Sequence, residues 1–188
     1  MTGDDRTLLV DASTFITLAE TGSCPLLYRT RGRTALPAAV QREITDDPAA
    51  SELERAVRSA DVHVLDSIAD DDARLEAYER ATEHLEQSIR TSPGNPAWTG
   101  DVALLGEALE RSDAVVVTDD KPLRDTCKAL SIPVSGSIGI LVRAVERGDI
   151  TADAATDVLL AMDETGARLS ARLLRRAERL IEDAASDR

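Results

Sequence analysis

Acidic side chains stand directly after two short apolar runs in this sequence. Asp11 follows the run Thr7–Val10. Asp119 and Asp120 follow the run Ala114–Val117 after one threonine. Both runs are typical of buried strands. In open α/β sheets, ligands collect beyond the carboxyl ends of the strands, where the strand order switches. If these two strands are neighbours, their terminal acids converge at one edge of the sheet.

Two further acids, Glu43 and Asp101, lie on predicted helices that start near or pass above the same edge. Crowded carboxylates repel one another, and a hard divalent cation relieves that repulsion. Ligands that are all oxygens select Mg²⁺ or Mn²⁺ over Zn²⁺. Such a site activates water for in-line attack on a phosphate, so these residues indicate metal-assisted phosphodiester hydrolysis. One acid alone carries little weight, because 35 of the 188 residues are Asp or Glu.

Alternating strand and helix patterns must position these acids. They predict a parallel, doubly wound α/β sheet with helices on both faces. The cluster of Pro, Gly and Asn at residues 92–96 predicts a loop, after which Thr99 caps a helix. The predicted strands are 7–10, 34–36, 62–65, 114–117 and 133–134. Four predicted helices have clear ranges: 12–20, 70–89, 122–130 and 138–146. Three others are a helix opened by Pro37 that carries Val40, Glu43 and Ile44, a helix ending near 59, and the helix capped by Thr99. The tail 151–187 adds two helices, which separate near Thr165 and Gly166.

The composition bounds the class of protein. The length suits one domain with a tail, and we expect a domain at 1–148 followed by a helical extension at 149–188. Cys24 and Cys127 lack neighbours at metal-ligand spacing, so we expect isolated thiols in a reducing compartment. No apolar run approaches the length needed to cross a bilayer, and the acidic start does not resemble a signal peptide. We therefore expect a cytoplasmic protein with no membrane partner.

The formal net charge of −13 argues at first against a nucleic-acid partner, because phosphate binding usually leaves a basic footprint. However, only two of the 22 basic residues are Lys, and the acids are spread along the whole chain. This pattern is typical of a halophilic protein, whose acidic surface maintains solubility and says little about its ligand. The charge therefore leaves RNA open as a partner.

Four segments combine these acids with a characteristic local pattern. Residues 9–16 (LVDASTFI) give a strand, an Asp and a Ser, and residues 36–44 (LPAAVQREI) give a predicted helix with an acid. Residues 100–105 (GDVALL) place Gly before an acid that opens a helix. Residues 115–121 (VVVTDDK) end a strand in acids, and 129–141 supply a last strand and turn. In this order, across residues 7–148, they resemble the PIN-domain family of nucleases.

That resemblance implies a three-layer α/β/α sandwich with strand order 3-2-1-4-5. It also implies metal-dependent endoribonuclease cleavage of RNA that leaves a 5′ phosphate. Asp11 would be a direct metal ligand with Asp101 beside it, and either Asp119 or Asp120 would bind directly or through water. Glu43 would orient the attacking water. Ser13 and Thr118 would fix the carboxylates by hydrogen bonds, although Ser13 could instead be a plain helix cap.

Several alternatives stay open at this point. Within the family, a toxin ribonuclease of the VapC type, held in check by an antitoxin protein, competes with a stand-alone RNA-processing nuclease. A catalytically inactive PIN-like RNA-binding or scaffold protein is the alternative from another class. A receiver-like domain also places acids at strand ends, but it would require a Lys after the last strand, where this chain has Pro133, Val134 and Ser135.

The tail adds candidate partners. It could serve as a homodimer contact, an RNA-binding element or a substitute for a partner's helix. Arg172, Arg175, Arg176 and Arg179 recur at helical spacing and could follow a phosphate backbone, although a solvated face is the plainer interpretation. Trp98 could stack on a base, but we expect it to pack.

Overall fold

The computed structural model describes residues 6–66, 72–85, 90–92, 95–167 and 169–186. Its central sheet has five parallel strands in the order β3-β2-β1-β6-β7. Because β4 and β5 pair separately, β6 and β7 are the fourth and fifth strands of this sheet, and the expected order 3-2-1-4-5 is confirmed. The strands are β1 (Thr7–Val10), β2 (Arg33–Pro37), β3 (His63–Leu65), β6 (Ala114–Val117) and β7 (Val134–Ser135).

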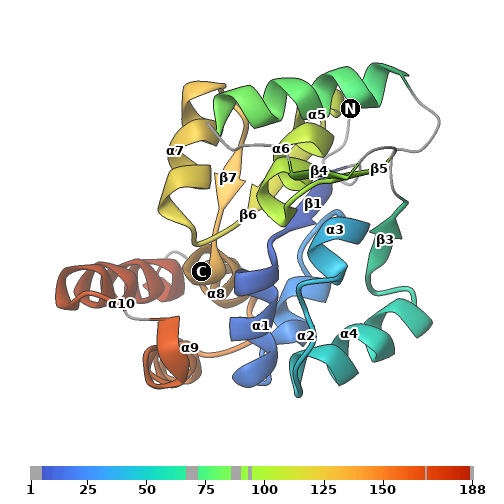
Figure 1. The fold of residues 1–188 in the computed structure, drawn as a ribbon. Coiled ribbons are helices and arrows are strands. Elements are labelled where there is room, and N and C mark those ends of the chain that lie inside the picture. Colours follow the sequence, from blue (N-terminus) through green and yellow to red (C-terminus); the bar gives the residue numbers. More distant parts are fainter. Residues whose placement is uncertain (1–5, 67–71, 86–89, 93–94, 168, 187–188) are drawn as a thin grey trace.

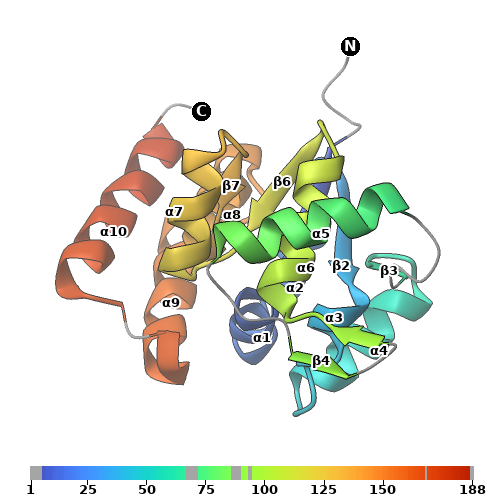
Figure 2. The same cartoon turned by 45° about the horizontal axis from the view of Figure 1, so that its top comes forward.

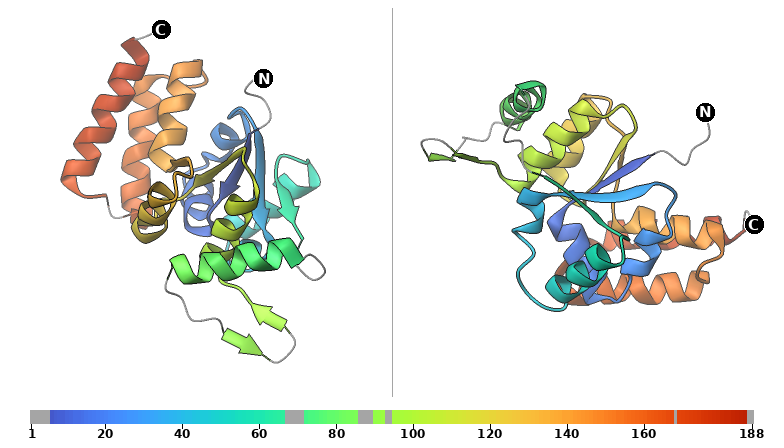
Figure 3. Two further views of the ribbon diagram at one scale, coloured as in Figure 1. Left: turned by 90° about the horizontal axis from the view of Figure 1, so that it is seen from above. Right: turned by 90° about the vertical axis from the view of Figure 1, so that its right-hand side faces the viewer.

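Helices cover both faces of this sheet, as the sequence predicted (Figure 1). One face carries α5, α6 and α7, and the other carries α1, α2, α4, α8 and α9 (Figure 3). The helices are α1 (Ala12–Glu20), α2 (Cys24–Tyr28), α3 (Ala38–Gln41), α4 (Ala49–Arg58), α5 (Asp72–His84), α6 (Gly100–Glu110), α7 (Lys121–Ala129), α8 (Ser137–Arg147), α9 (Ala152–Met162) and α10 (Ala171–Ser186).

The core is aliphatic, as the composition requires. The central strands β1 and β6 are covered from both faces, so Leu9, Val10, Val116 and Val117 are fully buried. This explains why these strands read as continuous apolar runs rather than alternating ones. Each such side chain contributes about 1.5–3 kcal/mol by leaving water. The core therefore fixes the two strands whose ends carry the acids.

One predicted helix is wrong in extent. Helix α3 ends at Gln41, so Glu43 and Ile44 lie after the helix rather than in it. The amides of Glu43 and Ile44 bond to carbonyls three residues earlier, which tightens and closes the last turn. Glu43 is therefore presented from a turn at the end of α3.

The segment before α6 also differs from expectation. Residues predicted as a loop form a small antiparallel ladder of β4 (Arg90–Ser92) and β5 (Asn95–Ala97). The predicted helix over 70–89 is observed as α5, which ends at His84, and residues 86–89 lie outside the described part of the chain. Extended backbone becomes a strand when a second segment supplies its hydrogen-bond partners. The local pattern of Pro, Gly and Asn does not contain that information.

The two tail helices were predicted, and both are present. Gly166 has a φ of +113°, which breaks the helical path between α9 and α10. Helix α10 buries Ala177, Ile181 and Ala184, and packs against α8 and α9 at the left of Figure 2. In the described ranges, no helix has both the length and the apolar character to cross a bilayer.

Candidate functional site

The strand register brings Asp11 against Thr118. β1 and β6 are paired along their whole length up to Val10 opposite Val117, and the amide of Asp11 continues the ladder to the carbonyl of Val117. The strand order reverses between β1 and β6, because β2 and β3 lie to one side and β7 to the other. The next residues of both strands therefore emerge together at the switch point, where α/β sheets bind ligands.

Asp11 is buried in this crevice, with only 5% of its surface exposed. Its Oδ2 accepts hydrogen bonds from the hydroxyls of Ser13 and Thr118, the latter at 3.1 Å. Burial raises the pKa of the Asp11 carboxyl above its ordinary value, and the nearby charge of Asp120 raises it further, while the two hydroxyls oppose the shift. The ionised Asp11 carboxylate is therefore destabilised by its burial and by the charge of Asp120, and a bound cation would offset both effects.

Asp119 and Asp120 have separate structural roles. The carboxylate of Asp120 caps α7 by accepting a bond from the amide of Leu123 at 2.8 Å. The carboxylate of Asp119 accepts bonds from the amide of Ser137, the first residue of α8, at 3.1 and 3.2 Å. Each acid therefore lies at a helix N-terminus, which favours its negative charge. Of the two, Asp120 acts electrostatically on Asp11.

Glu43 contacts the start of α6, the helix whose first turn carries Asp101. Helix α6 leads into the parallel strand β6, so it runs against the strands and its first turn lies at their carboxyl edge. The Oε1 of Glu43 accepts a bond from the amide of Gly100 at 2.8 Å, and Asp101 follows in the same turn. A Cβ on Gly100 would lie 2.8 Å from both Glu43 carboxylate oxygens. Glycine is therefore required for this approach.

The structure thus places the predicted acids on adjoining elements at one edge of the sheet. The charge of Asp120 acts on the Asp11 carboxyl and raises its pKa, and the amide of Asp120 donates to Thr118 Oγ1 at 3.1 Å, the hydroxyl that itself donates to Asp11. Among the described residues, no group of three or more His, Cys, Asp or Glu side chains lies close enough together to hold a metal. The full ring of acids remains a prediction. Two carboxylates fit Mg²⁺ or Mn²⁺, because Mg²⁺ usually keeps several waters and uses one or two protein carboxylates.

Sequence reasoning missed the residues that hold Asp119 in place. The guanidinium of Arg124 donates to the carbonyls of Thr118, at 2.6 Å, and of Ser135, so it joins the ends of β6 and β7. The amide of Asp119 donates to the buried Thr14 hydroxyl at 3.1 Å. A Cβ at Gly136 would collide with the Asp119 carboxylate. The bond to Thr14 spans 105 residues, and the other contacts join different elements, so no local pattern signals them.

Several other side chains weighed from the sequence have packing or surface roles in the structure. Trp98 packs edge-on against Tyr78 with ring centroids 5.6 Å apart, as expected of a packing residue. Cys24 and Cys127 are buried and free, and burial raises their pKa values to about 12 and about 11. Both thiols therefore stay protonated at neutral pH, which makes them poor metal ligands and nucleophiles. His63 and His84 are exposed.

A cleft of about 950 Å³ opens beside the acids, and we name it the edge cleft. It extends from Ser13, Asp119 and Asp120 past the edge strand β7, between α7, α8 and α10. Of the four arginines singled out on the last helix, Arg176 lines it. Arg172, Arg175 and Arg179 are exposed on α10 and are not among its lining residues.

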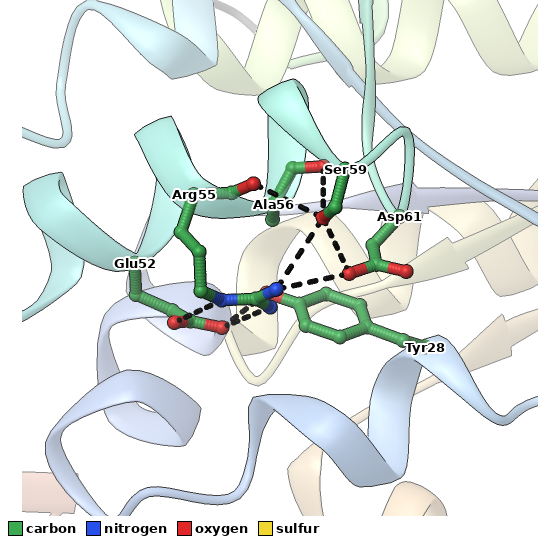
Figure 4. A network of polar contacts seen from close by, with 6 residues as sticks. All are labelled: Tyr28, Glu52, Arg55, Ala56, Ser59 and Asp61. Atoms are coloured by element: carbon green, nitrogen blue, oxygen red, sulfur yellow. Dashed lines mark hydrogen bonds and ion pairs between the residues drawn. The ribbon is translucent and has the colours of Figure 1, made fainter.

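A second cavity, of about 720 Å³, lies between α2 and α4. Its charged residues neutralise one another, because Arg55 is paired with Glu52 and Asp61 and lies over the ring of Tyr28 (Figure 4). None of the predicted site residues lines this cavity. We therefore place the candidate site at the switch point and not here.

The fold and the site together define a class: a parallel α/β sandwich of order 3-2-1-4-5 with buried and helix-capping carboxylates at its switch point. The DUF3368 family model, described as a PIN domain, matches residues 7–183. The chain therefore belongs to the PIN-domain family. PIN domains are in general nucleases, and they typically use divalent metal ions. A comparison with curated proteins found no match.

Proposed function

We propose that this chain is a metal-dependent endoribonuclease that hydrolyses RNA phosphodiester bonds at the switch point between β1 and β6. The observation that carries the proposal is Asp11, a carboxylate with 5% exposure that two hydroxyls hold and that the charge of Asp120 opposes. Keeping such a group buried is unfavourable unless a cation binds it. The family of the chain points the same way.

Each side chain has a role in this proposal. Asp11 and Asp120 would hold a Mg²⁺ or Mn²⁺ ion, which would supply Lewis-acid polarisation of the scissile phosphate. Both aspartates accept a bond from an amide at a helix N-terminus. Asp120 is preferred because its charge acts on Asp11 and its capping bond engages Oδ1, whereas both carboxylate oxygens of Asp119 accept from Ser137. Asp101, in the first turn of α6, would contribute a further carboxylate to that ion. Glu43, fixed on the amide of Gly100, orients the attacking water.

The reaction is a hydrolysis. The water oxygen forms a bond to phosphorus, and the bond from phosphorus to the 3′ oxygen breaks. One proton of the water passes to that oxygen, which leaves a 3′ hydroxyl and a 5′ phosphate. Ser13 and Thr118 keep the Asp11 carboxylate oriented while this occurs.

The test is cleavage of labelled single-stranded RNA by purified protein with Mg²⁺, Mn²⁺ or EDTA. We expect cleavage with either ion, none with EDTA, and a loss of at least about 100-fold in Asp11→Asn. Asp113→Asn is the matched control, because Asp113 precedes β6 at the opposite edge of the sheet and its carboxylate accepts a bond from the surface residue Thr7. It should cleave like the wild type.

The outcomes separate the alternatives. Wild-type-like cleavage by Asp11→Asn would overturn the assignment of the site. RNA binding by the wild type without cleavage under any of these ions would favour the catalytically inactive alternative. Whether a cleaving protein is a toxin or a processing enzyme depends on a partner. An antitoxin that co-purifies with the protein and blocks cleavage would support the toxin.

A further inference from the structure

The edge cleft combines features that the catalytic proposal does not use. Its charged lining is four cations, Arg124, Lys128, Arg143 and Arg176, against three carboxylates, Asp119, Asp120 and Glu146, an excess of one positive charge. The two aspartates lie at one end, and Arg124 is engaged on strand carbonyls. This local excess of positive charge lies on a chain whose net charge is −13. The cleft is therefore an exception to the surface around it, and its sign suits an anionic ligand.

The cations lie at a useful distance from the acids. Arg143 is six residues after Ser137, whose amide bonds Asp119, so it lies about 9 Å along α8 from that end. Lys128 is eight residues after Asp120, about 12 Å along α7. Since nucleic-acid phosphates follow one another at about 3.4 Å of rise or more, these cations are a few nucleotides from the acids.

These cations can change partners at little cost. Arg143 pairs with Glu146 at 2.8 Å and Lys128 with Asp125 at 3.4 Å, and both pairs are largely exposed to solvent. Exposed pairs of this kind contribute little to stability. A phosphate can therefore replace the carboxylate without destabilising the fold.

The cleft also presents apolar surface from the last helix. Leu173 and Leu180 line it and are 40% and 41% exposed, although most large apolar side chains here are buried. Leu173, Arg176 and Leu180 are spaced to share one face of α10. Single-stranded RNA alternates charged phosphates with apolar sugar and base faces. The arginine could bind a phosphate while the leucines on either side contact those apolar faces. The described lining of the cleft holds no aromatic ring, so these contacts would take the place of stacking.

We propose that the edge cleft binds a single strand of RNA, with Lys128, Arg143 and Arg176 on its phosphates, and guides it to the acids at the switch point. The proposal rests on the proposed function for the identity of the ligand, but binding can be measured without cleavage. It assigns α10 a direct role in substrate binding through one arginine of the four on that helix.

The test uses the full chain carrying Asp11→Asn, so that the strand stays intact in Mg²⁺. Fluorescence anisotropy of a short labelled single-stranded RNA gives the Kd over a series of KCl concentrations. We expect R143Q/R176Q to weaken binding about tenfold, and to reduce the slope of log Kd against log salt by about 0.7 for each phosphate that is no longer neutralised. The matched control is R172Q/R179Q, which makes the same charge change on exposed residues of α10 that do not line the cleft.

Equal weakening by both double variants would overturn the proposal, because binding would then follow overall charge and not the cleft. An unchanged Kd in R143Q/R176Q would overturn it as well. The variant Leu173→Ser/Leu180→Ser tests whether the cleft binds RNA or a second copy of the chain. Light scattering measures its oligomeric state, and anisotropy measures its RNA binding. If it converts a dimer into a monomer and leaves RNA binding unchanged, the cleft is a contact between copies of the chain and the proposal fails.

The same surface variants are also made in protein that keeps Asp11, and their cleavage of RNA is measured. This measurement distinguishes failure of the cleft proposal from failure of the nuclease proposal. The cleft proposal expects R143Q/R176Q to raise KM with little change in kcat, because these residues lie remote from the reacting bond. If the protein cleaves nothing but binds RNA through Arg143 and Arg176, the cleft stands and the nuclease proposal fails. If it cleaves RNA and R143Q/R176Q leaves both Kd and KM unchanged, the nuclease stands and the cleft proposal fails.

Discussion

At the scale of single residues, the buried carboxylate of Asp11 links binding, acidity and stability. Its pKa is raised chiefly by burial, so the folded protein holds this proton more tightly than the unfolded chain does. A group with a raised folded pKa contributes stability that is full below its unfolded pKa and is lost as the pH rises through its folded pKa. The ionised Asp11 therefore destabilises the metal-free protein at neutral pH.

Asp11→Asn should thus stabilise the metal-free protein. The amide keeps an oxygen that can accept from Ser13 and Thr118 and cannot ionise. We expect a higher Tm than the wild type at about pH 8 and little difference at about pH 4. Thermal melts in EDTA at both values test this, and a lower Tm of the variant at the higher pH would contradict it.

The same melts report on the ion. At about 100 times its Kd, Mn²⁺ should stabilise the wild type by about 2.7 kcal/mol, because it binds the folded protein alone. We expect Asp11→Asn to lose most of that increase, while Asp113→Asn keeps it. An equal Tm increase in all three proteins would show that the ion binds elsewhere.

Gly100 tests the placement of Glu43. In Gly100→Ala the new Cβ displaces the Glu43 carboxylate, which is exposed and can move away cheaply. We expect cleavage to fall by about 10- to 100-fold, as misplacement of a positioned group does. The free energy of unfolding should change by less than about 1 kcal/mol, because alanine suits a helix. Wild-type cleavage rates in Gly100→Ala would remove Glu43 from the mechanism.

At the scale of elements, two charged networks anchor different helices. Glu107 of α6 is buried at 1% exposure and is paired with Arg74 and Arg111, and it accepts a bond from Tyr78 at 2.7 Å. This network joins α5 to α6, the helix that carries Asp101. The network in Figure 4 joins α2 to α4 at the surface, through Arg55.

The two networks should differ in their contribution to stability. Glu107→Gln leaves two arginines facing a neutral group in a buried place, so we expect a loss of about 3 kcal/mol in the free energy of unfolding. Glu52→Gln removes a partner of Arg55, whose side chain is 47% exposed, and should cost at most about 1 kcal/mol. Urea denaturation of both variants measures the difference. Equal losses would contradict this ranking.

At the scale of the whole molecule, the net charge of −13 sets the response to salt. Like charges spread over one small protein repel each other, and this repulsion favours the unfolded chain. Salt screens it, because the Debye length falls from about 10 Å at 0.1 M to about 3 Å at 1 M.

We therefore expect the Tm to rise when KCl is raised from about 0.1 M to about 2 M, as the proposal of a halophilic protein requires. A neutral osmolyte at matched osmolarity is the control, since solute exclusion alone also stabilises folded proteins. A Tm that falls with KCl, or that rises equally with the osmolyte, would contradict the role of charge.

The amino-acid sequence by itself determined the fold class, the five strands of the sheet and the positions of Asp11, Asp119 and Asp120 after two of them. These features depend on the periodicity and chemistry of neighbouring residues, which a linear reading contains. The strand order was predicted because four segments of the sequence resemble, in the same order, the motifs of the PIN-domain family. The structure and the family match both confirm it.

Only the tertiary structure decided which groups bind each acid and what surrounds the acids. It placed Glu43 after α3 and on the amide of Gly100, bonded Asp119 to α8 and not to Asp11, and used Arg124 to join β6 to β7. It also brought Arg176 of α10 into the cleft beside these acids. These contacts join different elements of the chain, and their geometry follows from packing, which no local pattern encodes.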